Sequence, residues 1–150
     1  MDDNMMIDST TSARSTLTQN FQAIVNNNQV VLDWKDFSEK VLLRPRFPDY
    51  FRYFEIEVSD HPNERLIPHF PQAKAFIDDA LLNNGRVFVH CNGGISRSPA
   101  FVVAYVMETT KMDYQHAYSF VQNRRFCMNP NEGFKVQLKE YEPIYSARDS

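Results

Sequence analysis

The 150-residue sequence is poor in cysteine, has no basic excess and contains no long apolar run, and each shortage excludes a class of protein. Two cysteines are too few for a disulfide scaffold, which a chain of this size does not need. No Cys-x-x-Cys or His-x-x-x-His pair occurs, which argues against a zinc site. The net charge of −3 argues against nucleic-acid and anionic-membrane partners. No apolar run approaches the length of a membrane span.

The composition that remains is typical of a globular domain. Hydrophobic residues make up 43% of the chain and aromatic residues 13%, which is enough to build a core. The length favours a single domain, and we expect a monomer. The N-terminus opens on the acidic and polar run Met1-Asp2-Asp3-Asn4, unlike a secretory signal. We therefore expect a cytoplasmic or nuclear protein.

Composition divides the chain into three segments. Residues 1–20 are rich in Ser, Thr, Asn and Asp and are predicted to be a flexible tail. Residues 21–43 are ambiguous, because their pattern fits a helical turn near the start and a short buried strand at 30–32. Residues 44–147 are predicted to form the folded domain.

The first half of this domain has the pattern of a strand, a helix and a second strand. Residues 54–58 alternate between apolar and acidic side chains, which predicts a half-buried strand. Apolar residues at helical spacing predict a helix over about residues 68–84, with Gly85 as its C-cap. Residues 86–90 are rich in strand-forming side chains and are predicted to be a buried strand.

The second half is predicted to be helical. From Pro99 to Met107 the chain is apolar nearly all round, which predicts a central buried helix. Asp113 and Asn131 are predicted to cap two further helices. The apolar face of the last helix is predicted to consist of Phe134, Leu138, Tyr141 and Tyr145. The order of elements predicts an α/β layer followed by a helical cluster.

The connection at residues 91–98 has the composition of a phosphate-binding loop. Gly93 and Gly94 permit positive φ and close approach of the backbone to a ligand. Successive N–H groups can then point inward at the start of a helix, where the helix dipole favours an anion. Arg97 supplies a planar set of donors for two phosphate oxygens. The predicted phosphate-binding residues are Asn92, Gly93, Gly94, Ile95, Ser96 and Arg97.

Cys91 is the predicted nucleophile of this loop. It lies at the base of the loop, where the same positive field favours the thiolate over the thiol. His90 can orient the cysteine or the loop by hydrogen bonding, and the Ser98 hydroxyl can stabilise the departing thiolate. A lone cysteine at a strand end is more often simply buried. The combination of Cys91 with Arg97, Gly94 and Ser98 favours the phosphate loop over that alternative.

The string His-Cys-x5-Arg-Ser after a β-strand resembles the signature of the protein tyrosine phosphatases. The downstream run 129–134, Asn-Pro-Asn-Glu-Gly-Phe, is similar to the dual-specificity subgroup of that family. The resemblance covers residues 44–145 and implies a central mixed or parallel sheet flanked by helices. It also implies hydrolysis of phosphotyrosine, and of phosphoserine or phosphothreonine, through a phosphocysteine intermediate. Family domains begin with strands and a helix that residues 1–43 do not match. We therefore expect missing N-terminal strands, with residues 30–32 as the candidate replacement.

The resemblance further implies an acid and a supporting residue. In the family, an aspartate on a mobile loop protonates the leaving oxygen and then activates water. Asp60 matches that aspartate, although such a residue on its own is an ordinary turn former. Asp78 and Asp79 are alternatives, which the predicted helix places on a solvated face. Asn131 resembles the position that hydrogen-bonds to the phosphate loop, in addition to capping a helix.

Two alternatives to a protein phosphatase follow from the same residues. The first is a pseudophosphatase that binds phosphorylated proteins or kinases without turnover; such a relative carries glycine in place of the nucleophile, whereas this chain has Cys91. The second is a phosphoinositide phosphatase, against which the absence of lysine from residues 92–96 argues. A protein phosphatase remains the preferred interpretation, and it predicts phosphorylated proteins as substrates. It predicts no metal or organic cofactor, because the thiolate, the arginine and the amide dipoles supply the electrostatics. Cys127, beside Phe126, is predicted to be buried.

Overall fold

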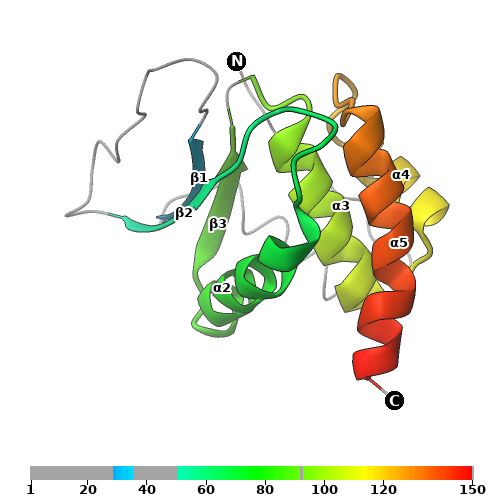
Figure 1. Ribbon diagram of the computed structural model, residues 1–150. Coiled ribbons are helices and arrows are strands. Elements are labelled where there is room, and N and C mark those ends of the chain that lie inside the picture. Colours follow the sequence, from blue (N-terminus) through cyan, green and yellow to red (C-terminus); the bar gives the residue numbers. More distant parts are fainter. Residues whose placement is uncertain (1–28, 36–50, 92, 150) are drawn as a thin grey trace.

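The computed structural model describes residues 29–35, 51–91 and 93–149, which form a parallel sheet with helices packed against it (Figure 1). The predicted tail at 1–20, the helical turn near residue 21 and the candidate Asn92 lie outside the described residues. The elements in chain order are β1 (Gln29–Lys35), β2 (Arg52–Glu57), the 3-10 turn η2 (Ile67–His69), α2 (Phe70–Leu82), β3 (Arg86–His90), α3 (Arg97–Thr110), α4 (Tyr114–Gln122) and α5 (Glu132–Arg148).

The sheet places β1 between the two strands that follow it in the chain. The strand order is β2-β1-β3, and both pairings are parallel. Leu32 lies opposite Phe54 on one side and Val89 on the other. The candidate strand at 30–32 is therefore confirmed, and it gives β3 a hydrogen-bonded neighbour. Among the described residues, no strand pairs with the opposite edge of β3.

The two strands predicted for the folded domain are both present, and β3 is less buried than expected. Ile56 is buried and Glu57 is exposed, as a half-buried strand requires. In β3, Val87 is fully buried whereas Phe88 is 44% exposed. Successive side chains of a strand point to opposite faces, so β3 is half-buried rather than buried.

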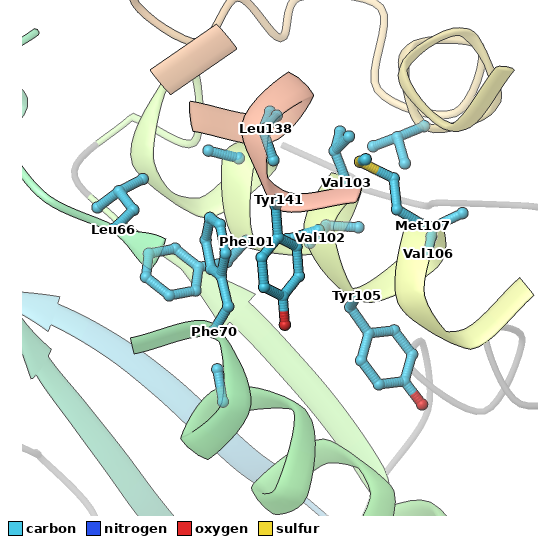
Figure 2. Packing of buried hydrophobic residues seen from close by; sticks show 14 of the residues in the cluster. Leu66, Phe70, Phe101, Val102, Val103, Tyr105, Val106, Met107, Leu138 and Tyr141 are labelled. Carbon is cyan, nitrogen blue, oxygen red and sulfur yellow. The ribbon is translucent and has the colours of Figure 1, made fainter. Parts of the chain in front are cut away.

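Helix α3 is the centre of the core, as the sequence predicts. Every residue from Arg97 to Glu108 is buried, and α2, α4 and α5 pack around the helix (Figure 1). The aromatic part of the core joins three elements. Phe70 makes edge-to-face contacts with Phe101 of α3, at 5.0 Å between ring centroids, and with Tyr141 of α5, at 4.8 Å (Figure 2). The predicted phosphate-binding loop at residues 91–98, called the phosphate loop below, thus runs directly into the most buried helix of the domain.

Helix α2 ends one residue earlier than its predicted C-cap glycine suggests. Asn84 takes the left-handed conformation, with φ 57°, in place of Gly85. The Asn84 N–H donates to Leu81 O at 3.2 Å, and the Gly85 N–H donates to Ala80 O at 2.7 Å. This pair of bonds is a Schellman motif with asparagine in the left-handed position. Glycine follows because a Cβ at residue 85 would stand 2.8 Å from that Ala80 oxygen.

The last two helices begin at the predicted caps. Asp113 Oδ1 accepts from the His116 N–H at 2.8 Å, and Asn131 Oδ1 accepts from the Phe134 N–H at 2.9 Å. The four apolar residues predicted to face the core from α5 are all buried. None of the helices within the described ranges combines the length and apolar character needed to span a bilayer.

Proline at position 31 is expected to disrupt the sheet, because β1 is hydrogen-bonded on both sides. Val31→Pro removes a backbone donor from the central strand, where proline is not tolerated. We expect it to lose at least about 2 kcal/mol more of the unfolding free energy than Val31→Ala, which keeps the N–H. Urea unfolding of both variants measures the difference. Equal losses would show that the pairing of β1 is not needed for stability.

Candidate active site

The candidate site is built at the junction of β3 and α3. The strand ends at His90, the helix begins at Arg97, and the loop between them turns through Gly93 and Gly94. These two glycines have φ of 85° and 63°, a region that side-chain-bearing residues rarely adopt. The positive φ expected from the sequence is therefore present at both positions.

The Cys91 thiol faces the start of α3. Cys91 is half-buried, and its Sγ lies 3.2 Å from Ser98 Oγ and 3.5 Å from the Ser98 backbone nitrogen, which donates to it. The unsatisfied N–H groups and the dipole of a helix N-terminus favour negative charge at this place. The contact that the sequence predicts between Ser98 and the sulfur is present in the structure.

The Arg97 side chain is buried beside the loop. Its residue is only 2% exposed, and Nη1 donates to Val58 O at 3.3 Å. Val58 directly follows β2 and precedes the loop that carries Asp60. A buried guanidinium needs hydrogen-bond acceptors, and the Val58 carbonyl provides one. The phosphate-binding role of Arg97 stays a prediction.

Asn131 joins the phosphate loop, the Asp60 loop and helix α5. Its backbone N–H donates to Ser96 Oγ at 2.9 Å, and its side chain caps α5 through Phe134. Its Nδ2 donates to Asp60 Oδ1 at 3.0 Å. Capping and loop contact are thus both present, and the loop contact uses the backbone of Asn131 rather than its amide side chain.

The Asp60 loop packs directly on the start of α5. A Cβ at Gly133 would stand 1.9 Å from Pro62 O, so only glycine allows this approach. Within the loop, the Glu64 N–H donates to His61 O at 2.9 Å. Asp60 itself is exposed, and the Asn131 bond ties it to the same residue that contacts the phosphate loop. The structure thus places Asp60, the predicted acid, beside Asn131. The chemical role of Asp60 stays a prediction.

The alternative acids lie on α2. Asp79 is exposed and pairs with Arg52 at 2.6 Å, as expected of a solvated face. Asp78 differs from that expectation, because it is half-buried, pairs with Lys74 and accepts from the Tyr105 hydroxyl at 2.8 Å. Burial and this bond raise the pKa of Tyr105. Both carboxylates therefore have structural partners of their own.

Two further sequence predictions have different outcomes. The His90 ring stacks on Phe88, with centroids 5.1 Å apart, and its proposed orienting role stays a prediction. Cys127 is exposed, so the prediction that it is buried was wrong. It stands in the turn after α4 beside Phe126, which is also exposed, because the apolar side chain that this segment buries in the core is Met128. Within residues 29–35, 51–91 and 93–149, no three His, Cys, Asp or Glu side chains gather as a metal site.

Arg125 contacts the loop in a way that the sequence did not predict. Its Nε donates to Gly94 O at 2.7 Å and its Nη2 to Gly93 O at 3.2 Å. Close by, the Asn129 N–H donates to Ile95 O at 2.7 Å. The only signal in the sequence is the pair Arg124-Arg125, and the sequence cannot show which of the two faces the loop.

Comparison with known proteins gives a consistent result. The family model described as "Dual specificity phosphatase, catalytic domain" matches residues 7–144, so the likeness begins well before residue 44, the start predicted from the sequence. The serine/threonine/tyrosine-interacting proteins of Mus musculus and Homo sapiens are 53% and 52% identical over 110 residues, which is 73% of this chain. That alignment covers 49% of each relative, so the chain spans about half the length of the curated relatives it matches.

Solved structures show the same fold. The crystal structure of human tyrosine phosphatase-like serine/threonine/tyrosine-interacting protein has a TM-score of 0.74 and 47% identity, covering 79% of this chain and 78% of that one. The crystal structure of DUSP15 has a TM-score of 0.68 and 30% identity, covering 79% of this chain and 72% of that one. These likenesses confirm the predicted α/β class and its phosphatase-like arrangement.

Substitutions of Asn131 are expected to separate its two side-chain roles. Asn131→Ala removes the helix cap and should lower the unfolding free energy by about 0.5–2 kcal/mol. Asn131→Asp keeps an N-cap acceptor but replaces the donor to Asp60 with a second carboxylate, so we expect a smaller loss of stability. Denaturant unfolding measures both. A loss well below about 0.5 kcal/mol in Asn131→Ala would contradict the capping role.

Proposed function

The chain belongs to the dual-specificity phosphatase family, and from this premise we propose that it hydrolyses phosphotyrosine, and phosphoserine or phosphothreonine, in proteins. The observation that carries the proposal is the position of Cys91, whose sulfur faces the start of α3 and the Ser98 hydroxyl. A thiolate stabilised there is a nucleophile at the base of an anion-binding loop.

In the first step, the Cys91 sulfur attacks phosphorus as the bond from phosphorus to the substrate oxygen breaks. Arg97 and the loop N–H groups stabilise the charge on the transferring phosphoryl oxygens. Asp60 donates its proton to the leaving oxygen, and the product is a phosphocysteine together with the free hydroxyl of the substrate.

In the second step, water hydrolyses the phosphocysteine. Asp60, now a carboxylate, takes a proton from the attacking water, and the bond from sulfur to phosphorus breaks. The Ser98 hydroxyl, 3.2 Å from Sγ, is placed to stabilise the departing thiolate. Inorganic phosphate leaves, and Cys91 and Asp60 return to their starting states.

Three observations support this assignment of roles. The guanidinium of Arg97 is buried at the loop rather than turned to solvent. Asp60 is joined through Asn131 to Ser96 of the loop. The sequence also has no segment like the deep phosphotyrosine-recognition loop of tyrosine-only enzymes, which favours a shallow pocket open to shorter phosphorylated side chains. We expect the protein to act as a monomer on cytoplasmic or nuclear proteins.

Binding without turnover is the second candidate function. Relatives 48–53% identical to this chain are named serine/threonine/tyrosine-interacting proteins, a name that describes interaction rather than hydrolysis. A buried arginine and inward amides suit binding of a phosphorylated protein or a kinase as well as catalysis. A thiol at residue 91 and a carboxylate at residue 60 are needed only for turnover, and the chain has both.

Replacement of the nucleophile tests the two functions against each other. We expect the unmodified chain to hydrolyse p-nitrophenyl phosphate and Cys91→Ser to lower the rate by at least about 10³-fold. Cys127→Ser is the matched control, because that exposed thiol lies outside the loop, and it should keep the rate. Tight phosphopeptide binding without turnover in the unmodified chain would support the binding function instead.

Removal of the proposed acid should matter most for a poor leaving group. For phosphotyrosine we expect Asp60→Asn to lower kcat/KM, which reports the first step and not the shared hydrolysis of the phosphocysteine, by about 10²–10⁴-fold, the usual contribution of general acid–base catalysis. The loss should be smaller for p-nitrophenyl phosphate, whose leaving group is stable as an anion. Asp79→Asn, the same change on the surface of α2, should leave both rates unaltered. If the Asp60 variant lost the same factor with both substrates, another group would be the acid.

A further inference from the structure

We propose that Arg125 is a positioning residue of the phosphate loop, which sets the direction of the amides that bind the phosphoryl group. The inference rests on the proposed phosphate-binding role of the loop. It goes beyond that role because it assigns part of the anion site to a side chain outside the Cys-x5-Arg loop.

One guanidinium bridges two consecutive carbonyl groups of the loop. Arg125 Nε donates to Gly94 O at 2.7 Å and Nη2 donates to Gly93 O at 3.2 Å. The planar fork of arginine suits such a two-point contact, and hydrogen bonds from a charged donor are stronger than neutral ones. Both carbonyls are therefore fixed in direction by the same side chain.

The direction of these carbonyls determines where the neighbouring amides point. The Gly93 carbonyl shares a peptide plane with the Gly94 N–H, and the Gly94 carbonyl shares one with the Ile95 N–H. The described residues contain no cis peptide, and in a trans peptide the C=O and N–H point in opposite directions. Arg125 therefore turns the Gly94 and Ile95 N–H groups away from itself, toward the inner side of the loop.

The loop conformation matches this contact. Gly94 has a φ of 63°, and a Cβ there would stand 2.4 Å from Arg125 Nη2. Glycine at position 94 thus serves both the left-handed backbone and the close approach of the guanidinium. Both requirements are met only by glycine, so the contact with Arg125 depends on the residue at position 94.

The backbone of Arg125 is also fixed by hydrogen bonds. Its N–H donates to Val121 O at the end of α4, at 3.0 Å, and its carbonyl accepts from the Met128 N–H at 3.1 Å. Two later bonds, from Asn129 to Ile95 and from Asn131 to Ser96, attach the same segment to the loop. Segment 125–131 therefore lies along the loop, with Arg125 as its charged contact.

Tungstate binding tests the proposal, because this phosphate-like oxyanion needs the loop amides but no chemical step. We expect Arg125→Met to weaken tungstate binding by about tenfold or more, as loss of charged hydrogen bonds implies. Arg124→Met is the matched control. It removes the same charge one residue away, where Arg124 Nη1 donates to Phe120 O of α4 at 2.6 Å. That variant should keep the affinity of the unmodified chain.

Arg125→Lys separates position from charge and remains available if the Met variant fails to fold. It keeps the charge, but a compact ammonium does not reproduce the planar two-point contact, so we expect intermediate affinity. The change in amide hydrogen exchange on adding tungstate gives a readout local to the loop, and comparing exchange with and without tungstate within each variant separates it from a change in overall stability. Tungstate should protect the Gly94 and Ile95 amides in the unmodified chain and in Arg124→Met, but less in the Arg125 variants.

Three results would overturn the proposal. They are unchanged tungstate affinity in Arg125→Met, full affinity in Arg125→Lys, and equal losses in the Arg124 and Arg125 variants. A chain that binds tungstate but hydrolyses no phosphate ester contradicts the proposed function alone. The test of Arg125 is unaffected by that outcome, because oxyanion binding does not require attack by Cys91.

Discussion

The left-handed backbone at Gly93 and Gly94 is the constraint on which the candidate site depends. It lets the chain leave β3, turn within a few residues and enter α3 with the Cys91 sulfur facing the helix start. A loop of this shape has its N–H groups on the inside and its carbonyls on the outside. The carbonyls then need donors from elsewhere in the fold, and the Arg125 side chain and the Asn129 N–H provide them.

The rest of the domain holds this turn in place through burial at one end and attachments at its sides. Helix α3 is buried from Arg97 to Glu108, so its first turn cannot shift without disturbing the core. Segment 125–131 contacts the phosphate loop directly, and Asn131 in that segment connects the loop to Asp60 of loop 59–64. The loop that carries the Cys91 thiol and the buried Arg97 is thus connected, through Asn131, to the Asp60 carboxylate from a distant part of the sequence.

Local chemistry explains which parts of the fold were predictable. The caps at Asp113 and Asn131 and the all-apolar run of α3 are signals contained in a few neighbouring residues, and all are confirmed. The wrong predictions at the end of α2 and at Cys127 depend on contacts in space that the local sequence does not specify. Asn84 replaced Gly85 in the left-handed position, because either residue can end a helix. The prediction that Cys127 is buried was wrong, because its local sequence does not show whether a side chain in a turn points to the core or to solvent.

The sequence by itself determined the loop from Cys91 to Ser98, because its chemistry depends on residue types at fixed spacing and on two adjacent glycines. Tertiary structure alone decided how the loop is supported. It placed β1 between β2 and β3, brought Asp60 to Asn131 and laid Arg125 against the carbonyls of the loop. The physical reason is that such contacts join residues about 20 to 70 positions apart. These contacts form when the core packs, and short sequence patterns do not specify which distant residues that packing brings into contact.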